Sequence, residues 1–443
     1  MVSDASVYRD LAERSWRWVL RQVRWTDGPW IPQSVDVDGD GEGSTTDDYR
    51  DGLHDGIGGL ALALAEVRAT RPWTAEEGDL ATALADRLAA QIATVTDVSF
   101  FDGLSGRVAT LLALDAPGEK GADAAIRRML DISTSDGWPA LPAHVTSYRP
   151  GARVNDATLG TASVLLAAVW AMRHDVDRAA ELADLAADVL LAEGEPGPDW
   201  TMVPPRFEQK PQAHMPNWSH GLSGIAGSLA LAGAELGRAD LVETARLGAE
   251  HLVSLGDTAD SGFVVPLSIP PADPAKANPV SYGWCHGPIG TSRLFLALDR
   301  AGVSEVAGRP TTSWYARGLH SVRVSGVPDR LWPGFWDNDG RCCGTAGVGD
   351  GFLDSFVRTG DADDLAFAVR LGDALVERAV VSDDHAYWRF LEHRAEEPLL
   401  PPGVGWMQGA AGISAYLFRL SRVVDQGRDA PIAPRLESWW VTT

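Results

Sequence analysis

The sequence predicts an all-α protein of the α/α toroid class, in which a double ring of helices closes on itself. One observation behind this prediction is a loop motif, Gly-x-x-Gly followed at once by an apolar stretch, which recurs seven times. The other is that amphipathic stretches of helical period fill the intervals, with no convincing run of the period-two pattern of strands. Each interval has room for two helices. Because a repeat architecture lets one core keep growing, we expect a single domain over residues 1–443.

The seven motif loops recur along the length of the chain. Successive first glycines are separated by 47 to 66 residues, and in the third loop Ser163 stands in the place of the second glycine. Small glycines at the start of a helix let backbones approach closely. We therefore expect all seven loops to lie on one face, around a central cavity. The first glycines are, in order, Gly56, Gly103, Gly160, Gly221, Gly287, Gly344 and Gly409.

Two kinds of helix alternate between the loops. The stretches directly after a loop are apolar almost all round, which is typical of helices buried on every side; examples are residues 60–65, 108–114, 164–170, 225–231 and 292–298. The stretches between them, such as 75–95 and 177–193, carry charge on one face and are expected to form the outer layer. An open superhelix is the structural alternative, but the terminal repeats are as regular as the internal ones.

Composition excludes several classes of function. Hydrophobic residues make up 45% and charged residues 22% of the chain, as in ordinary soluble proteins. No apolar run approaches the roughly 18 residues of a membrane span, and the first residues lack the apolar core of a signal peptide. We therefore expect a cytoplasmic protein without a transmembrane segment. The net charge of −23 opposes binding to nucleic acid or anionic membranes; it favours a basic or neutral partner, or serves solubility alone.

The three cysteines occupy two glycine-flanked loops: Cys285 in one, and the adjacent Cys342 and Cys343 in the other. Three thiols match the ligands of a zinc site whose fourth position stays open for water or substrate. A disulfide could run only from one of the adjacent pair to Cys285 and would leave an odd thiol. The alternative is three unrelated buried thiols. Three thiolates leave zinc with a charge of about −1, which suits activation of a substrate thiol better than hydrolysis.

Several motifs occur together in this chain: Trp284-Cys285-His286-Gly287, Cys342-Cys343-Gly344, Ser219-His220-Gly221 and the seven loops. In this combination the sequence resembles the lanthionine synthetase C-like cyclases, zinc enzymes that close thioether rings in ribosomally made peptides. Their signature has a WCxG loop, a later cysteine followed by a second ligand and glycine, and an earlier His-Gly loop. The resemblance covers essentially all 443 residues, and although each motif is weak alone, the combination is specific.

The resemblance implies an α/α barrel with one Zn²⁺ held by Cys285, Cys342 and Cys343. By the same resemblance His220 matches the family's active-site histidine, an acid or base in the cyclisation. Asp156, four residues before Gly160, matches an acidic residue at the corresponding spacing. Two alternatives stay open: Asp156 as a turn residue that satisfies loop amides, and His220 as a loop histidine that caps backbone groups.

The chain departs from the family pattern at three positions. Cys343 stands where the family usually has histidine, which gives a three-thiolate variant with a more electron-rich metal. Ser281 stands where an arginine is frequent, and His286 stands where a tyrosine is frequent. Substrate positioning and handling of the enolate are therefore expected to differ. His286 either replaces the tyrosine as a proton donor or packs beside the metal ligands as a hydrogen-bonding group.

The function that follows from the resemblance is a zinc-dependent lanthipeptide cyclase. A peptide cysteine thiol would add to a dehydroalanine or dehydrobutyrine in a Michael-type reaction, and His220 with Asp156 would deliver the proton to the α-carbon. We expect the dehydrated precursor peptide as substrate and a separate dehydratase as partner, because no dehydratase or kinase segment is found. No nucleotide-binding P-loop is present either.

Two other classes of function compete with the cyclase. One is a LanC-like adaptor that binds zinc and thiols such as glutathione without turnover. The other is a different toroidal enzyme, such as a glycosidase or a prenyl-chain enzyme. A glycosidase would need a carboxylate pair, which Asp55 and Asp102 supply only loosely, and it would leave the three thiols unexplained.

Three further segments stand out. The long loops 196–216 and 257–279 are either binding segments or plain surface excursions. The acidic stretch 36–47 has the spacing of a calcium loop, but its last acid is the shorter Asp47 and no clear helix precedes it. A solvated acidic loop is the favoured interpretation of that stretch.

Overall fold

The computed structural model of the protein describes residues 4–38, 43–44, 49–115, 121–138, 148–149, 151–194, 198–271, 273, 279–329, 338–391 and 399–442. Most of the acidic stretch 36–47 lies outside these residues, as do parts of both long loops. The chain divides into two compact units. Unit 1 comprises Met1–Ala90, Thr110–Ala116 and Gly326–Thr443, and unit 2 comprises Gln91–Ala109 and Pro117–Ser325. The single domain expected over 1–443 stays a prediction.

Unit 1 contains the beginning and the end of the chain. Its helices are α1 (Ala5–Arg21), α2 (Leu60–Thr70), α3 (Ala75–Gln91), α13 (Thr345–Thr359), α14 (Ala362–Arg378) and α15 (Ala410–Gln426). Short 3₁₀ turns lie at η2 (Ile57–Gly59), η6 (Gly427–Asp429) and η7 (Trp439–Val441). Within this unit α13 pairs with α14, and α15 also contacts α2 and α13.

Unit 2 contains successive inner helices with their outer partners. Helix α6 (Thr161–Met172) pairs with α7 (Ala179–Glu193), α8 (Leu222–Leu236) with α9 (Ala239–Leu255), and α11 (Arg293–Arg300) with α12 (Thr311–Val324). The inner helices α6, α8 and α11 also contact one another in this order. The remaining elements are α5 (Ala122–Asp131), α10 (Pro288–Thr291), η4 (Pro205–Phe207) and η5 (Ala259–Ser261), while α4 (Leu104–Ala113) spans the division between the units.

The strands of the described residues are all two residues long. Each pairs with a neighbour as an antiparallel ribbon: β1 (Ser34–Val35) with β2 (Gly43–Ser44), β3 (Glu305–Val306) with β4 (Arg309–Pro310), β5 (Val380–Val381) with β6 (Ala386–Tyr387), and β7 (Phe390–Leu391) with β8 (Leu399–Leu400). Helices therefore form the core, as the absence of period-two patterning predicted.

The predicted division into inner and outer helices is confirmed in unit 2. Residues 161–171 of α6 are buried all round, and so are the first twelve residues of α8. By contrast, α7 buries one face and α9 buries residues at helical spacing. The predicted apolar stretch 292–298 differs in one respect, because Ser292 separates the short α10 from α11.

The motif glycines start the inner helices because the chain folds back tightly at each loop. Gly221 is the N-cap residue of α8, and a Cβ atom there would lie 1.6 Å from the carbonyl oxygen of Met215. At the second motif position, a Cβ on Gly224 would lie 2.0 Å from the carbonyl oxygen of Trp218. Real Cβ atoms do not approach a carbonyl so closely, which explains why glycine recurs at this spacing.

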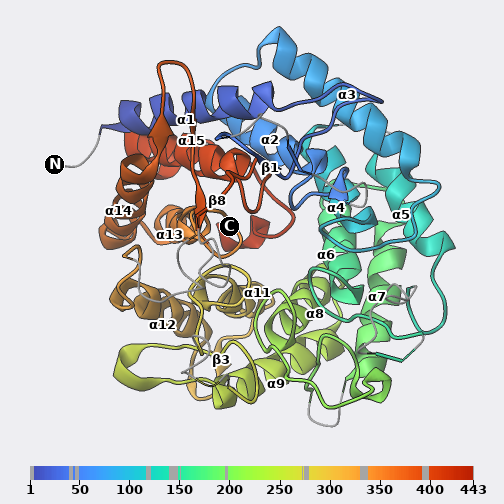
Figure 1. Ribbon diagram of the computed structural model, residues 1–443. Coiled ribbons are helices and arrows are strands. Elements are labelled where there is room, and N and C mark those ends of the chain that lie inside the picture. Colours follow the sequence, from blue (N-terminus) through green and yellow to red (C-terminus); the bar gives the residue numbers. More distant parts are fainter. Residues whose placement is uncertain are drawn as a thin grey trace. The chain divides into compact units, whose positions relative to one another are not determined.

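The first and last α-helices of the described chain pack along each other within unit 1, as Figure 1 shows for α1 and α15. Helix α1 is capped by Asp4, whose carboxylate accepts a hydrogen bond from the Ser6 amide, and it buries Tyr8, Leu11 and Trp16 along one face. It thus supplies an outer partner for the inner helix α15. None of the described helices is long and apolar enough to cross a membrane.

Candidate metal and catalytic site

The loops before α6 and α8 bring Asp156 and His220 together in unit 2. Nδ1 of His220 lies 2.7 Å from Oδ2 of Asp156, and the carboxylate is fully buried while the imidazole is 22% exposed. The other carboxylate oxygen accepts hydrogen bonds from the backbone amides of Thr158 (3.1 Å) and Leu159 (2.6 Å). Asp156 therefore both satisfies loop amides, as the turn interpretation predicts, and contacts His220, as the resemblance implies. Three donors fix the orientation of the carboxylate.

This arrangement also fixes how His220 carries its protons. An ionised carboxylate can only accept, so Nδ1 bears a hydrogen and Nε2 is left to exchange a proton with a substrate. Thr158 supports the same tautomer. Its hydroxyl donates to the Ser219 carbonyl (3.0 Å), and its oxygen, 3.3 Å from Nδ1 of His220, keeps a lone pair that can accept from the Nδ1 hydrogen. A buried carboxylate behind a partly exposed histidine is an arrangement suited to general acid–base chemistry.

The loop of Cys285 is joined to the loop of His220 within the same unit. The Ser219 amide donates to the Cys285 carbonyl at 3.0 Å. The rings of His220 and His286 lie 5.3 Å apart between centroids, tilted by 40°. Trp284 is buried and meets the ring of Phe101 edge-on at 6.3 Å. The structure therefore places Asp156, His220, Cys285 and His286 on neighbouring loops, all of which lead into inner helices.

The adjacent cysteines lie in unit 1, on the loop that leads into α13. The Sγ atoms of Cys342 and Cys343 are 3.5 Å apart, and neither is in a disulfide. The Cys342 amide donates to the Met407 carbonyl at 3.0 Å, which ties this loop to the loop before α15. Two thiolates on one tetrahedral zinc with bonds of about 2.3 Å lie about 3.8 Å apart. The observed spacing of the two sulfur atoms therefore fits shared coordination.

The third thiol of the chain, Cys285, lies in unit 2 and offers the same kind of soft sulfur ligand. Cys285 and Cys342 are buried and Cys343 is partly buried. Thiolate ligands select zinc over hard cations such as Mg²⁺ or Ca²⁺.

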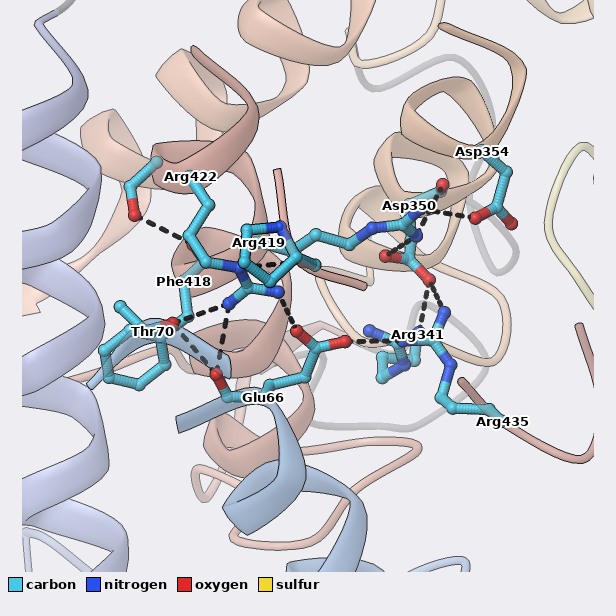
Figure 2. Close-up of polar contacts among 11 residues, drawn as sticks. Glu66, Thr70, Arg341, Asp350, Asp354, Phe418, Arg419, Arg422 and Arg435 are labelled. Carbon is cyan, nitrogen blue, oxygen red and sulfur yellow. Dashed lines mark hydrogen bonds and ion pairs between the residues drawn. The ribbon is translucent and has the colours of Figure 1, made fainter. Parts of the chain in front are cut away.

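Buried charges meet around Asp350 in unit 1 (Figure 2), and one of them, Arg341, directly precedes Cys342 in the sequence. Asp350 receives hydrogen bonds from Arg341 at 2.6 Å, from Arg419 at 2.8 Å and from Arg435. Burial would raise the pKa of Asp350, but the three guanidinium groups outweigh burial and hold it well below its ordinary value. Burial lowers the pKa of Arg341, and the Asp350 carboxylate partly opposes this effect.

Sequence reasoning missed this cluster of charges and also a second histidine–carboxylate pair. Nδ1 of His54 lies 2.8 Å from Oδ2 of Asp55, and both side chains are about one-quarter exposed. The His54 carbonyl accepts a hydrogen bond from the Met407 amide (2.9 Å). The available signal was the position of His54 in the first motif loop. The buried charges gave no such signal, because their hydrogen-bonded partners are separated by anything from 9 to 369 residues, without a fixed spacing.

Both long loops pack near the site in unit 2. Met202 and Val203, from the first loop, belong to a small apolar cluster with Ala152 and Val154 beside the loop of Asp156. The two long loops also bond to each other, through paired backbone hydrogen bonds of 2.9 and 2.7 Å between His214 and Ile269. Their described parts are thus built into the unit and support the loop that carries Asp156.

Solved structures share this fold. Nisin cyclase matches with a TM-score of 0.56 and 14% sequence identity, over 84% of this chain and 89% of that chain. A sugar epimerase from a ruminal bacterium matches with a TM-score of 0.50 and 10% identity, over 93% and 97% of the two chains. Cellobiose 2-epimerase from Bacillus thermoamylovorans matches with a TM-score of 0.50 and 12% identity, over 93% and 98%. These similarities confirm the predicted α/α toroid class and, at such low identity, concern the fold alone.

No curated protein sequence matches the chain. The family described as "Lanthionine synthetase C-like protein" matches residues 47–426, which includes all seven motif loops and the three cysteines. This match confirms the resemblance seen in the sequence, and the chain belongs to the lanthionine synthetase C-like family.

Proposed function

We propose that the protein is a zinc-dependent lanthipeptide cyclase, which forms lanthionine or methyllanthionine rings from a dehydrated peptide. The observation that carries this proposal is the contact of His220 with Asp156 on a loop bonded directly to the loop of Cys285. Sugar epimerases share the fold, but three cysteines outside any disulfide, all in motif loops, favour sulfur chemistry. Membership of the family and the fold shared with nisin cyclase support the same reaction.

Cys285, Cys342 and Cys343 would hold one Zn²⁺ and leave a fourth position for the substrate. Zinc held by these residues would lower the pKa of a substrate cysteine thiol, so that the thiol would be a nucleophilic thiolate at neutral pH. The donor set fits this task, because three thiolates more than offset the charge of the metal and would keep a fourth sulfur electron-rich.

His220 would move the proton that the reaction requires. A C–S bond forms at the β-carbon of the dehydro residue, its C=C π bond breaks, and the α-carbon gains a proton in exchange for the one lost by the thiol. The reaction is therefore neither a net oxidation nor a net reduction. Nε2 of His220 is the atom that delivers the proton, while Asp156 holds Nδ1 and stabilises the imidazolium.

His286 would act beside His220 rather than in place of it. Its ring lies against that of His220, with 5.3 Å between the centroids. From there it orients the neighbouring imidazole or supplies a second proton donor, the role left open by the missing tyrosine. We also propose a separate dehydratase as partner and a cytoplasmic location, where free thiols persist.

The proposal is tested with purified protein and a synthetic peptide that carries one cysteine and one dehydroalanine. Ring closure leaves the mass unchanged but removes the thiol, so a thiol-capping reagent followed by mass spectrometry counts open peptide. We expect the wild type to consume cappable thiol, and His220→Ala to do so about 10²- to 10⁴-fold more slowly with bound zinc retained. Zinc without thiol loss on several dehydrated peptides would instead favour the zinc- and thiol-binding adaptor. An absence of zinc in reduced protein would refute both functions.

A further inference from the structure

A cluster of buried charges in unit 1 has no part in the chemistry proposed above. It combines four arginines and four carboxylates, so its charges balance; the members are Glu66, Arg341, Asp350, Asp354, Arg419, Arg422, Arg435 and Glu437. Their side chains are at most 11% exposed. Figure 2 shows that the contacts run continuously from Glu66 through Arg435 to Asp350 and Arg341.

The cluster joins segments that are distant in the sequence. Glu66 lies on α2, Asp350 on α13 and Arg422 on α15, while Arg435 comes from the segment after the last α-helix. Arg422 donates to Glu66 at 2.5 Å, and Arg435 donates to the other oxygen of the same carboxylate at 2.9 Å. Two arginines thus share Glu66, but Arg435 alone of these two also reaches Asp350.

Arg341 connects this cluster to the adjacent cysteines. It precedes Cys342 directly, and the amides of both residues donate to the Met407 carbonyl, at 2.8 and 3.0 Å. Its guanidinium group lies 4.2 Å from the ring centroid of Trp406 and donates to Asp350 at 2.6 Å. The side chain is therefore fixed at both its stacking face and its hydrogen-bonding end, and the backbone of the cysteine loop is fixed with it.

Stability alone does not account for so many buried charges. Desolvation of the ions largely cancels their attraction, and well-packed apolar residues are commonly as stable. Ion pairs of this kind are directional, unlike apolar contacts, because a guanidinium group meets a carboxylate in one geometry. A site whose two ligands are adjacent in sequence needs that kind of constraint, because a small rotation of the loop would separate the sulfur atoms.

We propose that Arg341 is a positioning residue, held by Asp350 and through it by Arg435, which keeps Cys342 and Cys343 in the geometry that binds the metal. This inference rests on the proposed zinc site. It gives the segment after α15 a function, since Arg435 brings that segment into contact with the carboxylate that holds Arg341. Removal of contacts behind metal ligands typically weakens binding about 10- to 100-fold.

The test compares zinc affinity, by competition with a chromogenic chelator, in wild type, Arg341→Met, Arg435→Met and Arg422→Met. The last is a matched control, because it removes a buried arginine from the same Glu66 carboxylate without touching Asp350. Asp350 and Glu66 each keep at least one other arginine in every variant, which favours folding, and circular dichroism checks it. We expect about 10- to 100-fold weaker zinc binding in Arg341→Met, a smaller loss in Arg435→Met and no change in Arg422→Met.

Unchanged affinity in folded Arg341→Met would overturn the inference, and so would an equal loss in Arg422→Met, because that would report general destabilisation. Hydrogen exchange of the segment 338–347 in zinc-free protein gives a second readout. We expect this segment to exchange faster in Arg341→Met than in the wild type, and Arg422→Met to exchange like the wild type. Equal protection of the segment in the two variants would count against a positioning role. If the wild type binds no zinc, the proposed function fails, and this exchange measurement alone decides whether Arg341 holds the loop.

Discussion

His220 and Asp156, 64 residues apart in the sequence, meet through a hydrogen bond of 2.7 Å between Nδ1 and Oδ2. The carboxylate lies behind the histidine, buried in the loop before α6, so that it holds one ring nitrogen and leaves the other available. This relationship makes the two residues a functional pair and leads to the first prediction.

His220→Ala is expected to lower the rate of thiol consumption about 10²- to 10⁴-fold, the usual contribution of a general acid or base. Asp156→Asn should lower it less, because the imidazole stays in place but loses its charged partner. Zinc content should not change in either variant. His251→Gln is a suitable control, since His251 lies on the outer helix α9. Equal activity of wild type and His220→Ala would exclude the proposed role.

Replacement of any one of the three cysteines by alanine is expected to remove most of the bound zinc. Two thiolates and water form a much weaker site than three thiolates. Elemental analysis of reduced, desalted protein gives the stoichiometry, with about one zinc per chain expected in the wild type. Full zinc content in Cys285→Ala would show that this thiol is not a ligand.

The motif glycines are expected to be required for packing rather than for chemistry. In Gly224→Ala the new Cβ would lie 2.0 Å from the Trp218 carbonyl oxygen and 2.8 Å from Cβ of Ala157, so α8 must shift. We expect a loss of about 1–3 kcal/mol in the free energy of unfolding. Gly78→Ala is the matched control: this glycine lies inside α3 with nothing within 4 Å, and alanine there should stabilise the helix by about 0.5–1 kcal/mol. Chemical denaturation measures both, and a loss of stability in Gly78→Ala would contradict the argument.

Stability is expected to fall in acid, in part because of Glu77 at the start of α3. Burial would raise its pKa, but hydrogen bonds from Arg71, the Thr74 amide and Trp16 outweigh burial and lower it below the ordinary 4.5. A carboxyl with a lowered folded pKa stabilises the fold above its unfolded value, and that stabilisation is lost as the pH falls through the folded value.

Glu77→Gln should therefore be less stable than wild type near neutral pH and should lose less stability between about pH 7 and about pH 4. Glu76→Gln, which changes an exposed neighbour in the same first turn, is the control. Urea unfolding at both pH values gives the comparison. Identical pH dependence in the wild type and Glu77→Gln would show that Glu77 does not contribute.

Much of the fold was predictable because its signals are local. The seven glycine loops, the apolar helices after them and the amphipathic helices between them each follow from composition and period within a single segment. The cysteine motifs and the His-Gly loop were likewise readable, and the family match over residues 47–426 agrees with them. The break between α10 and α11 at Ser292 was missed, since the apolar pattern continues across it.

The sequence by itself determined the repeat, the helical class and the residue types available for chemistry, because period, glycine spacing and thiol content are properties of short segments. Only the tertiary structure decided which side chains meet. Arg419 and Arg422 lie on the inner helix α15, where both are buried and paired with carboxylates. Asp156 pairs with His220, and Glu66 pairs with Arg435, because helices distant in sequence pack side by side. A buried charge is tolerated only where its partner is supplied, and the partner comes from elsewhere in the chain.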